Sequence, residues 1–165
     1  MQNLKIRPAT AYDCEAMADI YNGYVRDSVI TFEEKEVTPT QMAARLAEVM
    51  GQNLPWLVAE GVEGLLGYAY ATPWKSRSAY RFSLESTIYL DPLHAGKGVG
   101  KGLYGALLDQ LRARHCHTVL AGIALPNPAS IALHERLGFT QVGELKEVGF
   151  KQGRWVDVGY WQLRL

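Results

Sequence analysis

"HAGKGVGKGLYGALL", residues 94–108, decides the fold because a glycine-rich loop stands directly before a helical pattern. Glycines fall at alternate positions from Gly96 to Gly102. One helix face then follows, formed by Leu103, Tyr104, Leu107, Leu108 and Leu111. A predicted strand ends at Leu90, ahead of the loop. A loop between a strand and a helix presents free backbone N–H groups at the positive end of the helix dipole, so this stretch predicts an anion site.

Two common phosphate-binding motifs do not fit this loop. The P-loop motif requires Ser or Thr after Gly-Lys, and here Gly102 follows Lys101. The dinucleotide motif G-x-G-x-x-G also fails, because these glycines recur at every second residue. The remaining interpretations are a different phosphate-containing ligand or a flexible, solvated turn.

Composition predicts one soluble domain over residues 1–165. The chain is 48% hydrophobic, and its 17 basic residues balance 17 acidic ones. This balance argues against nucleic-acid binding through bulk charge. No apolar run is long enough to span a membrane, and the first ten residues lack a signal-peptide core, so we expect a cytoplasmic protein. Cys14 and Cys116 lie far apart and imply no disulfide framework.

The residue patterns predict the element order β-α-α-β-β-β-α-β-α-β-β, a mixed α/β domain. Strands are expected at 4–10, where the first ends at a turn, and at 55–60, 63–74, 82–91 and 117–125, followed by two C-terminal strands with turns at Gly149 and Gly153. Helices are expected to begin after Thr10, Thr38, the glycine loop and Asn127, and residues 28–37 to be extended or loop.

A family resemblance explains the glycine loop. "AGKGVG" (95–100) resembles the pyrophosphate loop of the GNAT acetyltransferases, Gln/Arg-x-x-Gly-x-Gly/Ala, with Ala95 departing from its first position. "NPASIALHERLGF" (127–139) resembles the second cofactor segment of that family, and "STIYL" (86–90) the strand that pairs with the pantetheine arm. The resemblance implies the GNAT acyl-CoA N-acyltransferase fold, with about seven mixed strands and flanking helices, and acetyl-CoA as co-substrate. The implied cofactor contacts are Ile88, Tyr89, Leu90, Gly96, Lys97, Gly98, Val99, Gly100, Lys101 and Asn127.

Several stretches between Ile6 and Trp161 are similar to the phosphinothricin acetyltransferases within this superfamily. They are "PWLVAE", "YAYATPWKSRSAY", "ESTIYL", "LHERLGF" and "GFKQGRWVDVGYWQ". This resemblance implies acetyl transfer to the α-amine of phosphinothricin or methionine sulfoximine or sulfone, a herbicide-resistance activity, and a homodimer. The alternatives are another amino acid or a protein N-terminus as acceptor, or a CoA-binding sensor domain without catalysis.

Acetyl transfer to an ammonium group requires a base near the amine and a proton donor near the departing thiolate. Alternation places Glu85 on one strand face with Thr87 and Tyr89, opposite Leu84, Ser86, Ile88 and Leu90. A carboxylate in a buried strand is costly unless it is paired or functional, whereas an edge-strand glutamate simply faces solvent. The resemblance assigns the base to Glu85.

The second catalytic candidate is His134, which stands where many GNAT enzymes carry a tyrosine. Its imidazole is expected to donate a proton or to position the amine or the sulfur, and the alternative is a structural histidine. Tyr104 fits the helix core better than a donor role. "HCH" (115–117) lacks a third ligand at suitable spacing, so no metal site is expected.

The acceptor is expected to lie beside "PWKSRSAYR" (73–81), which combines cations with aromatic residues. Arginine grips carboxylate or phosphinate groups with paired hydrogen bonds, and aromatic walls exclude water. A solvated basic loop is the alternative. The resemblance implies acceptor contacts from Phe32, Trp74, Lys75, Arg77, Tyr80, Ser86 and Thr87.

Overall fold

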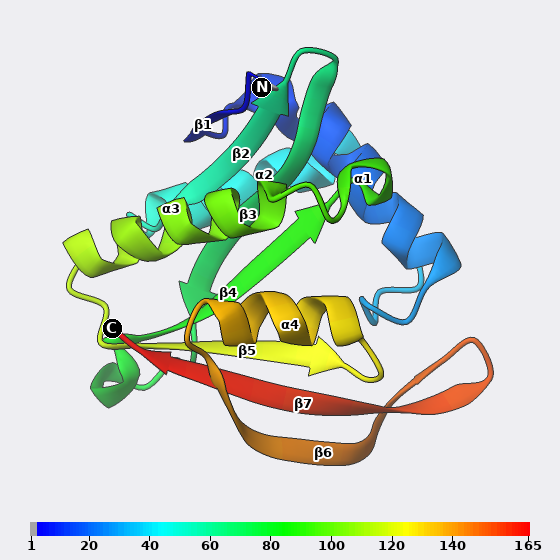
Figure 1. Ribbon diagram of the computed structural model, residues 1–165, viewed down its shortest axis with the longest axis vertical. Helices are drawn as coiled ribbons and strands as arrows, with labels where there is room; N and C mark the ends of the chain where they lie inside the picture. The colour runs from blue at the N-terminus through cyan, green and yellow to red at the C-terminus, as the bar shows by residue number, and fades with distance from the viewer. Residues whose placement is uncertain (1–2) are drawn as a thin grey trace.

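A mixed seven-stranded sheet is the centre of the structure, a computed structural model that describes residues 3–165 (Figure 1). The strands are β1 (Lys5–Pro8), β2 (Trp56–Gly61), β3 (Gly64–Pro73), β4 (Ser83–Leu90), β5 (Thr118–Ala124), β6 (Thr140–Lys151) and β7 (Arg154–Arg164). They lie in the order β1-β2-β3-β4-β5-β7-β6. Neighbouring strands are antiparallel except β4 and β5, which are parallel. The predicted fold class is confirmed.

The helices are α1 (Cys14–Asp27), α2 (Pro39–Gly51), α3 (Val99–Ala113) and α4 (Pro128–Arg136), with short 3-10 turns η1 (Ala11–Asp13), η2 (Ser78–Tyr80) and η3 (Pro92–His94). This order of helices and strands confirms the predicted one, and residues 28–38 form the loop between α1 and α2. No helix within residues 3–165 is long and apolar enough to cross a membrane.

Two hydrophobic cores lie on opposite faces of the sheet. Along β2, Leu57 and Ala59 contribute to the core beneath α3, whereas Trp56 and Val58 contribute to the core beneath α1 and α2. This alternation follows from the two-residue period of a strand. The predicted inward face of α3 is at most 2% exposed, at Leu103, Tyr104, Leu107, Leu108 and Leu111. The face of the sheet that carries α3 also receives partly buried side chains of α4 (Figure 1).

The predicted capping box at the start of α2 is present. Thr38 Oγ1 accepts a hydrogen bond from the backbone N–H of Gln41 at 3.1 Å, and Gln41 Oε1 accepts one from the Thr38 N–H at 2.9 Å. Pro39 occupies the first turn of α2, where its missing N–H costs nothing. Such caps contribute about 1 kcal/mol each, because they satisfy donors that the helix leaves free.

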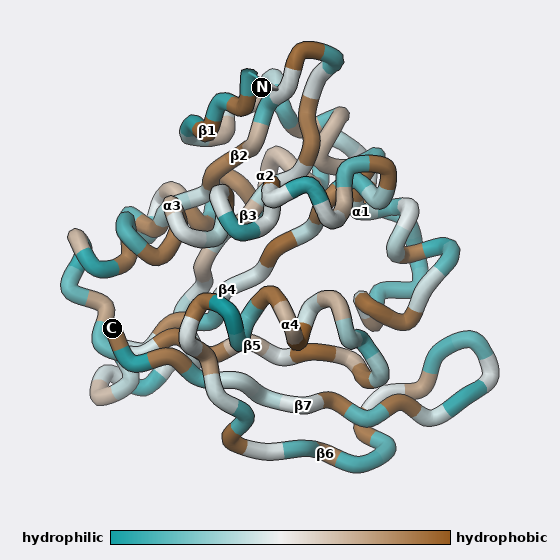
Figure 2. Tube along the Cα trace, in the orientation of Figure 1, coloured by the Kyte–Doolittle hydropathy of each residue, from teal (hydrophilic) through white to brown (hydrophobic). Residues whose placement is uncertain are grey.

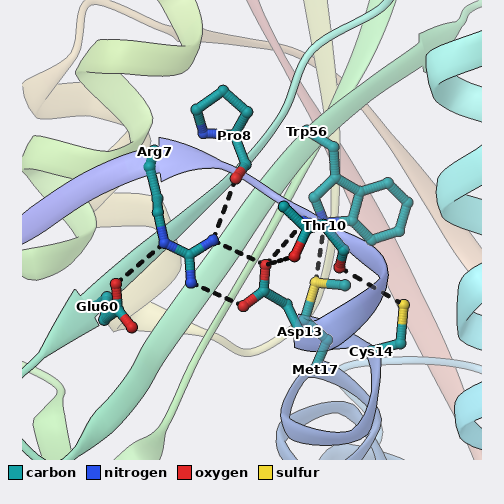
Figure 3. Close-up of polar contacts among 8 residues, drawn as sticks. All are labelled: Arg7, Pro8, Thr10, Asp13, Cys14, Met17, Trp56 and Glu60. Carbon is teal, nitrogen blue, oxygen red and sulfur yellow. Dashed lines mark hydrogen bonds and ion pairs between the residues drawn. The ribbon is translucent and has the colours of Figure 1, made fainter.

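An ion-pair cluster fixes β1 against β2 and the entry to α1 (Figure 3). Arg7 donates two hydrogen bonds to the Asp13 carboxylate, both 2.8 Å long, and a third to Glu60 at 3.0 Å. Asp13 is only 7% exposed and also accepts the N–H of Thr10 at 2.8 Å. The Arg7 guanidinium therefore holds the pKa of Asp13 below its ordinary value.

The predicted turn at Gly149 is wrong. Strand β6 continues through Gly149 to Lys151, and the hairpin turns at Gly153, as predicted, where φ is +73°. A register shift occurs between Leu145 and Gly149. A Cβ atom on Gly149 would lie 2.4 Å from two ring carbons of Phe32, so this glycine serves close approach rather than a turn.

Candidate active site

Strands β4 and β5 separate after three register pairs, which join Ser83 to Thr118, Leu84 to Val119 and Glu85 to Leu120. Beyond Glu85, β4 continues to Leu90 with β3 as its neighbour, while β5 pairs with β7 over its whole length. Figure 1 shows β4 and β5 diverging from this point. The edge of β4 that faces β5 therefore has no strand partner after Glu85, and its backbone groups are available to a ligand.

A cavity of about 300 Å³ opens where the two strands separate. It is lined by residues from the α1–α2 loop, β4, β5, α4 with its N-cap, and β7. The predicted site residues among them are Phe32, Glu85, Ser86, Thr87, Ile88, Tyr89, Asn127 and His134. Residues predicted separately for base, cofactor and acceptor thus line one space.

Glu85 lines this cavity and is the last residue of β4 that pairs with β5. Burial raises the pKa of its carboxyl group, and the positive charge of Lys75 opposes that shift. Its neighbours follow the predicted alternation, since Tyr89 packs against Tyr21 of α1 at 5.1 Å between ring centroids. A carboxylate with raised proton affinity inside a cavity has the properties of a general base.

His134 is 3% exposed and is held by its own helix. Its Nδ1 lies 2.7 Å from the carbonyl oxygen of Ser130, which accepts hydrogen bonds only, so Nδ1 carries the proton. The imidazole ring also packs edge-on against Tyr104 and Phe139. Burial lowers the pKa of His134 and the Ser130 carbonyl opposes this. The neutral ring therefore presents Nε2 as an acceptor.

Tyr104 belongs to the core, as its spacing predicted, and is fully buried. Its hydroxyl forms a short hydrogen bond with Oγ of Ser86, which lines the cavity. Burial raises the pKa of Tyr104, so the phenol stays protonated. The pair connects the cavity wall to the core beneath α3.

The glycine loop has two kinds of glycine. Gly96 and Gly98 have φ of +78° and +81°, and a Cβ on either would meet no atom within 4 Å. Gly98 is the N-cap of α3, where the first N–H groups of the helix have no intrahelical partner. Gly100 instead packs closely, since a Cβ there would lie 3.0 Å from Leu90 Cδ1 and 3.3 Å from Leu133 Cδ2. The loop is therefore open to a ligand around Gly96 and Gly98, beside the N-terminus of α3, and packed against the protein at Gly100.

Lys97 and Lys101 are exposed beside this N-terminus, and Val99 is buried. Ala95 is exposed and carries no polar side chain. At the end of the predicted cofactor strand that precedes this loop, the backbone oxygen of Leu90 accepts a short hydrogen bond from the Tyr24 hydroxyl. That carbonyl is therefore already engaged within the protein.

Asn127 is the N-cap of α4 and lines the cavity. Its side-chain oxygen accepts the N–H of Ser130 at 3.2 Å, with Pro128 at the first helical position. The side chain thus fixes the start of the helix that carries His134. Gly138, with φ of +95°, ends the same helix as predicted.

The basic loop after β3 lies beside the cavity and does not line it. Trp74 packs edge-on against Tyr160, a cavity residue, at 5.6 Å between ring centroids. Lys75 places its ammonium 4.9 Å from the Trp74 ring centroid and acts on Glu85 through its charge. Arg77 and Tyr80 are exposed and are absent from the cavity wall. The structure therefore brings only the first part of this loop close to Glu85.

Sequence reasoning missed half of the cavity wall. Ile30 and Thr31 come from the α1–α2 loop, Ala121–Ala124 from β5, and Val158 and Tyr160 from β7. The alternation of Val158 and Tyr160 shows that they share a strand face, but not that the face meets β4. The loop residues carry no periodic signal.

Cys14 and Cys116 are both buried and both free, so no disulfide joins them. Within residues 3–165, no group of three or more His, Cys, Asp or Glu side chains is arranged to hold a metal ion.

Comparison with known proteins agrees with this geometry. The family model described as "Acetyltransferase (GNAT) domain" matches residues 6–159, and the chain therefore belongs to the GNAT acetyltransferase family. A phosphinothricin N-acetyltransferase from Streptomyces viridochromogenes is 46% identical over 96% of this chain and 86% of its own. An L-methionine sulfoximine/L-methionine sulfone acetyltransferase from Salmonella typhimurium is 36% identical, covering 98% of this chain and 95% of its own.

A solved structure supports the same fold. A GNAT superfamily phosphinothricin acetyltransferase from Sinorhizobium meliloti, in complex with AcCoA, is 39% identical with a TM-score of 0.94. The match covers 98% of this chain and 88% of that one. The predicted resemblance and the predicted GNAT fold are both confirmed.

Proposed function

We propose that this chain, as one domain, transfers the acetyl group of acetyl-CoA to the α-amine of a small amino-acid-like acceptor. The proposed acceptors are phosphinothricin and methionine sulfoximine or sulfone, which are the compounds named in the descriptions of its relatives. The observation that carries the proposal is the position of Glu85, at the point where β4 and β5 separate and inside the cavity between them.

The residues at the start of α3 fit the pyrophosphate of a CoA molecule. Open space above Gly96 and Gly98 permits an anion to approach the backbone, and the N–H groups of Val99, Gly100 and Lys101 have no helical partner. The exposed ammonium groups of Lys97 and Lys101 add positive charge. Because Ala95 contributes no side-chain donor, the backbone N–H groups supply most of the hydrogen bonds to the pyrophosphate.

The strand edge beyond Glu85 suits an extended arm with amide groups. Ile88 and Tyr89 line the cavity along this edge, whose backbone groups lack a β5 partner. An amide-bearing chain laid there forms the hydrogen bonds of a missing strand. The thioester at the end of such an arm then lies near Glu85 and His134.

The acceptor reacts after Glu85 removes a proton from its ammonium group, directly or through a water molecule. The neutral amine attacks the thioester carbonyl carbon, an amide bond forms, and the carbon–sulfur bond breaks. Burial helps Glu85 in this role because a higher carboxyl pKa narrows the gap to the ammonium pKa. The amine nitrogen loses its second proton as the amide forms, and the departing thiolate takes up one proton, so that free CoA thiol is released.

His134 acts in this scheme by positioning the reacting groups. Its Nδ1 proton is engaged by Ser130, so its Nε2 accepts rather than donates in the neutral ring. This geometry favours the positioning role over donation to the thiolate. The hydroxyl of Ser86, which forms a hydrogen bond with that of Tyr104, is one of the neutral donors that line the cavity.

The anionic end of the acceptor lies toward the Trp74–Lys75 segment in this proposal. Lys75 is close enough to alter the proton affinity of Glu85, and Trp74 packs on a cavity residue. Phe32 covers the cavity from the α1–α2 loop, and Thr87 lines it from β4. Arg77 and Tyr80 complete the basic aromatic loop from the solvent side.

The test is a thiol-release assay. The purified protein is mixed with acetyl-CoA and a panel of amino acids that includes phosphinothricin, methionine sulfone and short peptides. Free thiol and an N-acetylated amino acid are the expected products, with free amino acids preferred over peptides. Cofactor binding without thiol release from any amine contradicts the proposal and favours a CoA-binding sensor.

A cytoplasmic homodimer and a role in herbicide resistance are part of the same proposal. Strand β6 is the edge of the sheet, and hydrophobic residues are interspersed with hydrophilic ones along it (Figure 2). Phe150 and Trp155 on this hairpin are 56% and 62% exposed and pack against each other. Covering this apolar edge with a second copy removes an aggregation-prone surface. Light scattering of the wild-type protein and of Trp155→Glu tests the dimer, which the substitution is expected to weaken.

A further inference from the structure

A buried lysine joins the β6–β7 hairpin to the α1–α2 loop. The Nζ atom of Lys151 donates a hydrogen bond to the backbone carbonyl of Thr31 at 2.8 Å. Lys151 is 3% exposed, so its ammonium group lies under the loop rather than in solvent. Burial lowers the pKa of Lys151, while the charges of Glu34 and Glu33 oppose the shift.

Gly149, two residues before Lys151 on the same strand, contacts the next loop residue, Phe32. The Phe32 ring lies where a Cβ on Gly149 would be, with three ring carbons within 2.9 Å of that position. Gly149 has no positive φ, so its backbone conformation does not require glycine. The space taken by the Phe32 ring does. Lys151 and Gly149 therefore hold two consecutive loop residues, Thr31 and Phe32.

The inner side of the loop is fixed independently. Thr31 Oγ1 and the hydroxyl of Tyr21 on α1 lie 2.8 Å apart, and Glu33 pairs with Arg45 of α2 at 2.5 Å. Thr31 is thus held from α1 on one side and from β6 on the other. Both Thr31 and Phe32 line the cavity, whereas neither Lys151 nor Gly149 does.

We propose that Lys151 and Gly149 are positioning residues that determine which acceptors the cavity admits, because they fix Thr31 and Phe32 as its outer wall. This inference rests on the proposed function. Burying a lysine ammonium costs free energy that a methionine of similar length avoids. What the lysine adds is the bond to the Thr31 carbonyl. The cavity wall includes the apolar side chains of Ile30, Phe32 and Val158, which suit the methylene chain of a small acceptor.

The test compares two substitutions with matched controls on the same strand. Lys151→Met removes the bond to Thr31, and Lys146→Met removes a lysine that is exposed and pairs with Glu144 and Asp157. Gly149→Ala places a methyl group against Phe32, and Gly143→Ala places one where no atom lies within 4 Å. Melting temperatures establish that each variant is folded.

The first measurement is steady-state kinetics with two acceptors of different chain length. Lys151→Met and Gly149→Ala are expected to raise the acceptor KM about tenfold, the size of one lost hydrogen bond to a charged group, and to change the preference between acceptors. The KM for acetyl-CoA is expected to stay within about twofold, since the glycine loop is untouched. Both controls should match the wild type. An equal rise of both KM values, or no change in either, overturns the positioning role.

The second measurement needs no catalysis. Amide hydrogen exchange over residues 28–37 of the free protein is expected to be faster in Lys151→Met and Gly149→Ala than in the two controls. Unchanged exchange overturns the inference whatever the activity. A wild-type protein that acetylates no acceptor contradicts the proposed function instead, while faster exchange in the two variants still supports the attachment of the loop.

Discussion

Glu85 and Leu120 form the last register pair between β4 and β5. The carboxylate is therefore anchored where the backbone is still held by strands on both sides, at the residue from which the cavity opens. A base at this position is fixed by the sheet rather than by a loop. This placement favours catalysis because a misplaced reacting group loses much of the benefit of proximity.

Replacing Glu85 with glutamine is expected to lower kcat/KM for the acceptor by about 10²–10⁴-fold at neutral pH, the usual contribution of a positioned base. The amide keeps the shape but accepts no proton. Steady-state thiol release measures the change, with Glu63→Gln in the exposed β2–β3 turn as control. A variant that keeps the wild-type rate and pH profile excludes Glu85 as the base.

The pH dependence of kcat/KM should report the ionisation of Glu85. The base is active when ionised, so activity falls as the pH drops through its raised pKa. Lys75→Met removes the cation that opposes this shift, which raises the pKa further and moves the acid limb of the profile to higher pH. Lys146→Met, whose partners are Glu144 and Asp157, serves as the control. An acid limb that stays in place shows that Lys75 does not act on the base.

Gly98→Val is expected to raise the KM for acetyl-CoA about tenfold, because a side chain fills the approach to N–H groups that bind the charged pyrophosphate. The positive φ of Gly98 also strains any other residue. Gly153→Ala carries a similar φ of +73° far from the loop and controls for that strain. If the two variants have equal KM values for acetyl-CoA, the backbone N–H groups of the glycine loop do not bind the pyrophosphate.

The imidazole of His134 is expected to be neutral at pH 7 with its proton on Nδ1. Burial lowers its pKa, and the Ser130 carbonyl fixes the tautomer. Nitrogen NMR shifts of the labelled histidine distinguish the two ring nitrogens. A protonated Nε2 at neutral pH contradicts the positioning role and restores His134 as a donor.

Arg7→Met is expected to lower the free energy of unfolding by about 2 kcal/mol, because it leaves the buried Asp13 carboxylate without its two charged donors. The loss should be present at neutral pH. Since the folded pKa of Asp13 is lowered, its stabilisation is complete above the unfolded value of about 3.9 and disappears as the pH falls toward the folded pKa. Urea unfolding at several pH values measures both effects. Arg112→Met breaks an exposed pair with Asp109 and should change stability little.

Local signals were sufficient for the order of the elements. Thr38 and Gln41 form the predicted capping box, and the apolar spacing from Leu103 to Leu111 became the buried face of α3. Such features depend on neighbours in sequence. The prediction of a turn at Gly149 was wrong because glycine occurs both in turns and where another group approaches the backbone closely. The group that approaches here is the ring of Phe32, which comes from a loop distant in sequence.

The site was predictable where a motif or alternation marked it, as at Glu85, Asn127 and His134. Arg77 and Tyr80 were placed in the acceptor wall by resemblance, yet they stand outside the cavity. Thr31 and Tyr160 were missed because the loop and the last strand reach the cavity only through the sheet order. A lysine between Phe150 and Gln152 gives no sign in sequence that its ammonium is buried.

The parting of β4 from β5 leaves the two halves of the sheet joined by three register pairs. In the proposed function, the pantetheine arm of acetyl-CoA lies in this gap like an additional strand, and the co-substrate then also stabilises the folded protein. Stability is then coupled to supply: at a hundred times its dissociation constant, a ligand of the native state adds about 2.7 kcal/mol. In this proposal the folded state is most stable when acetyl-CoA is abundant.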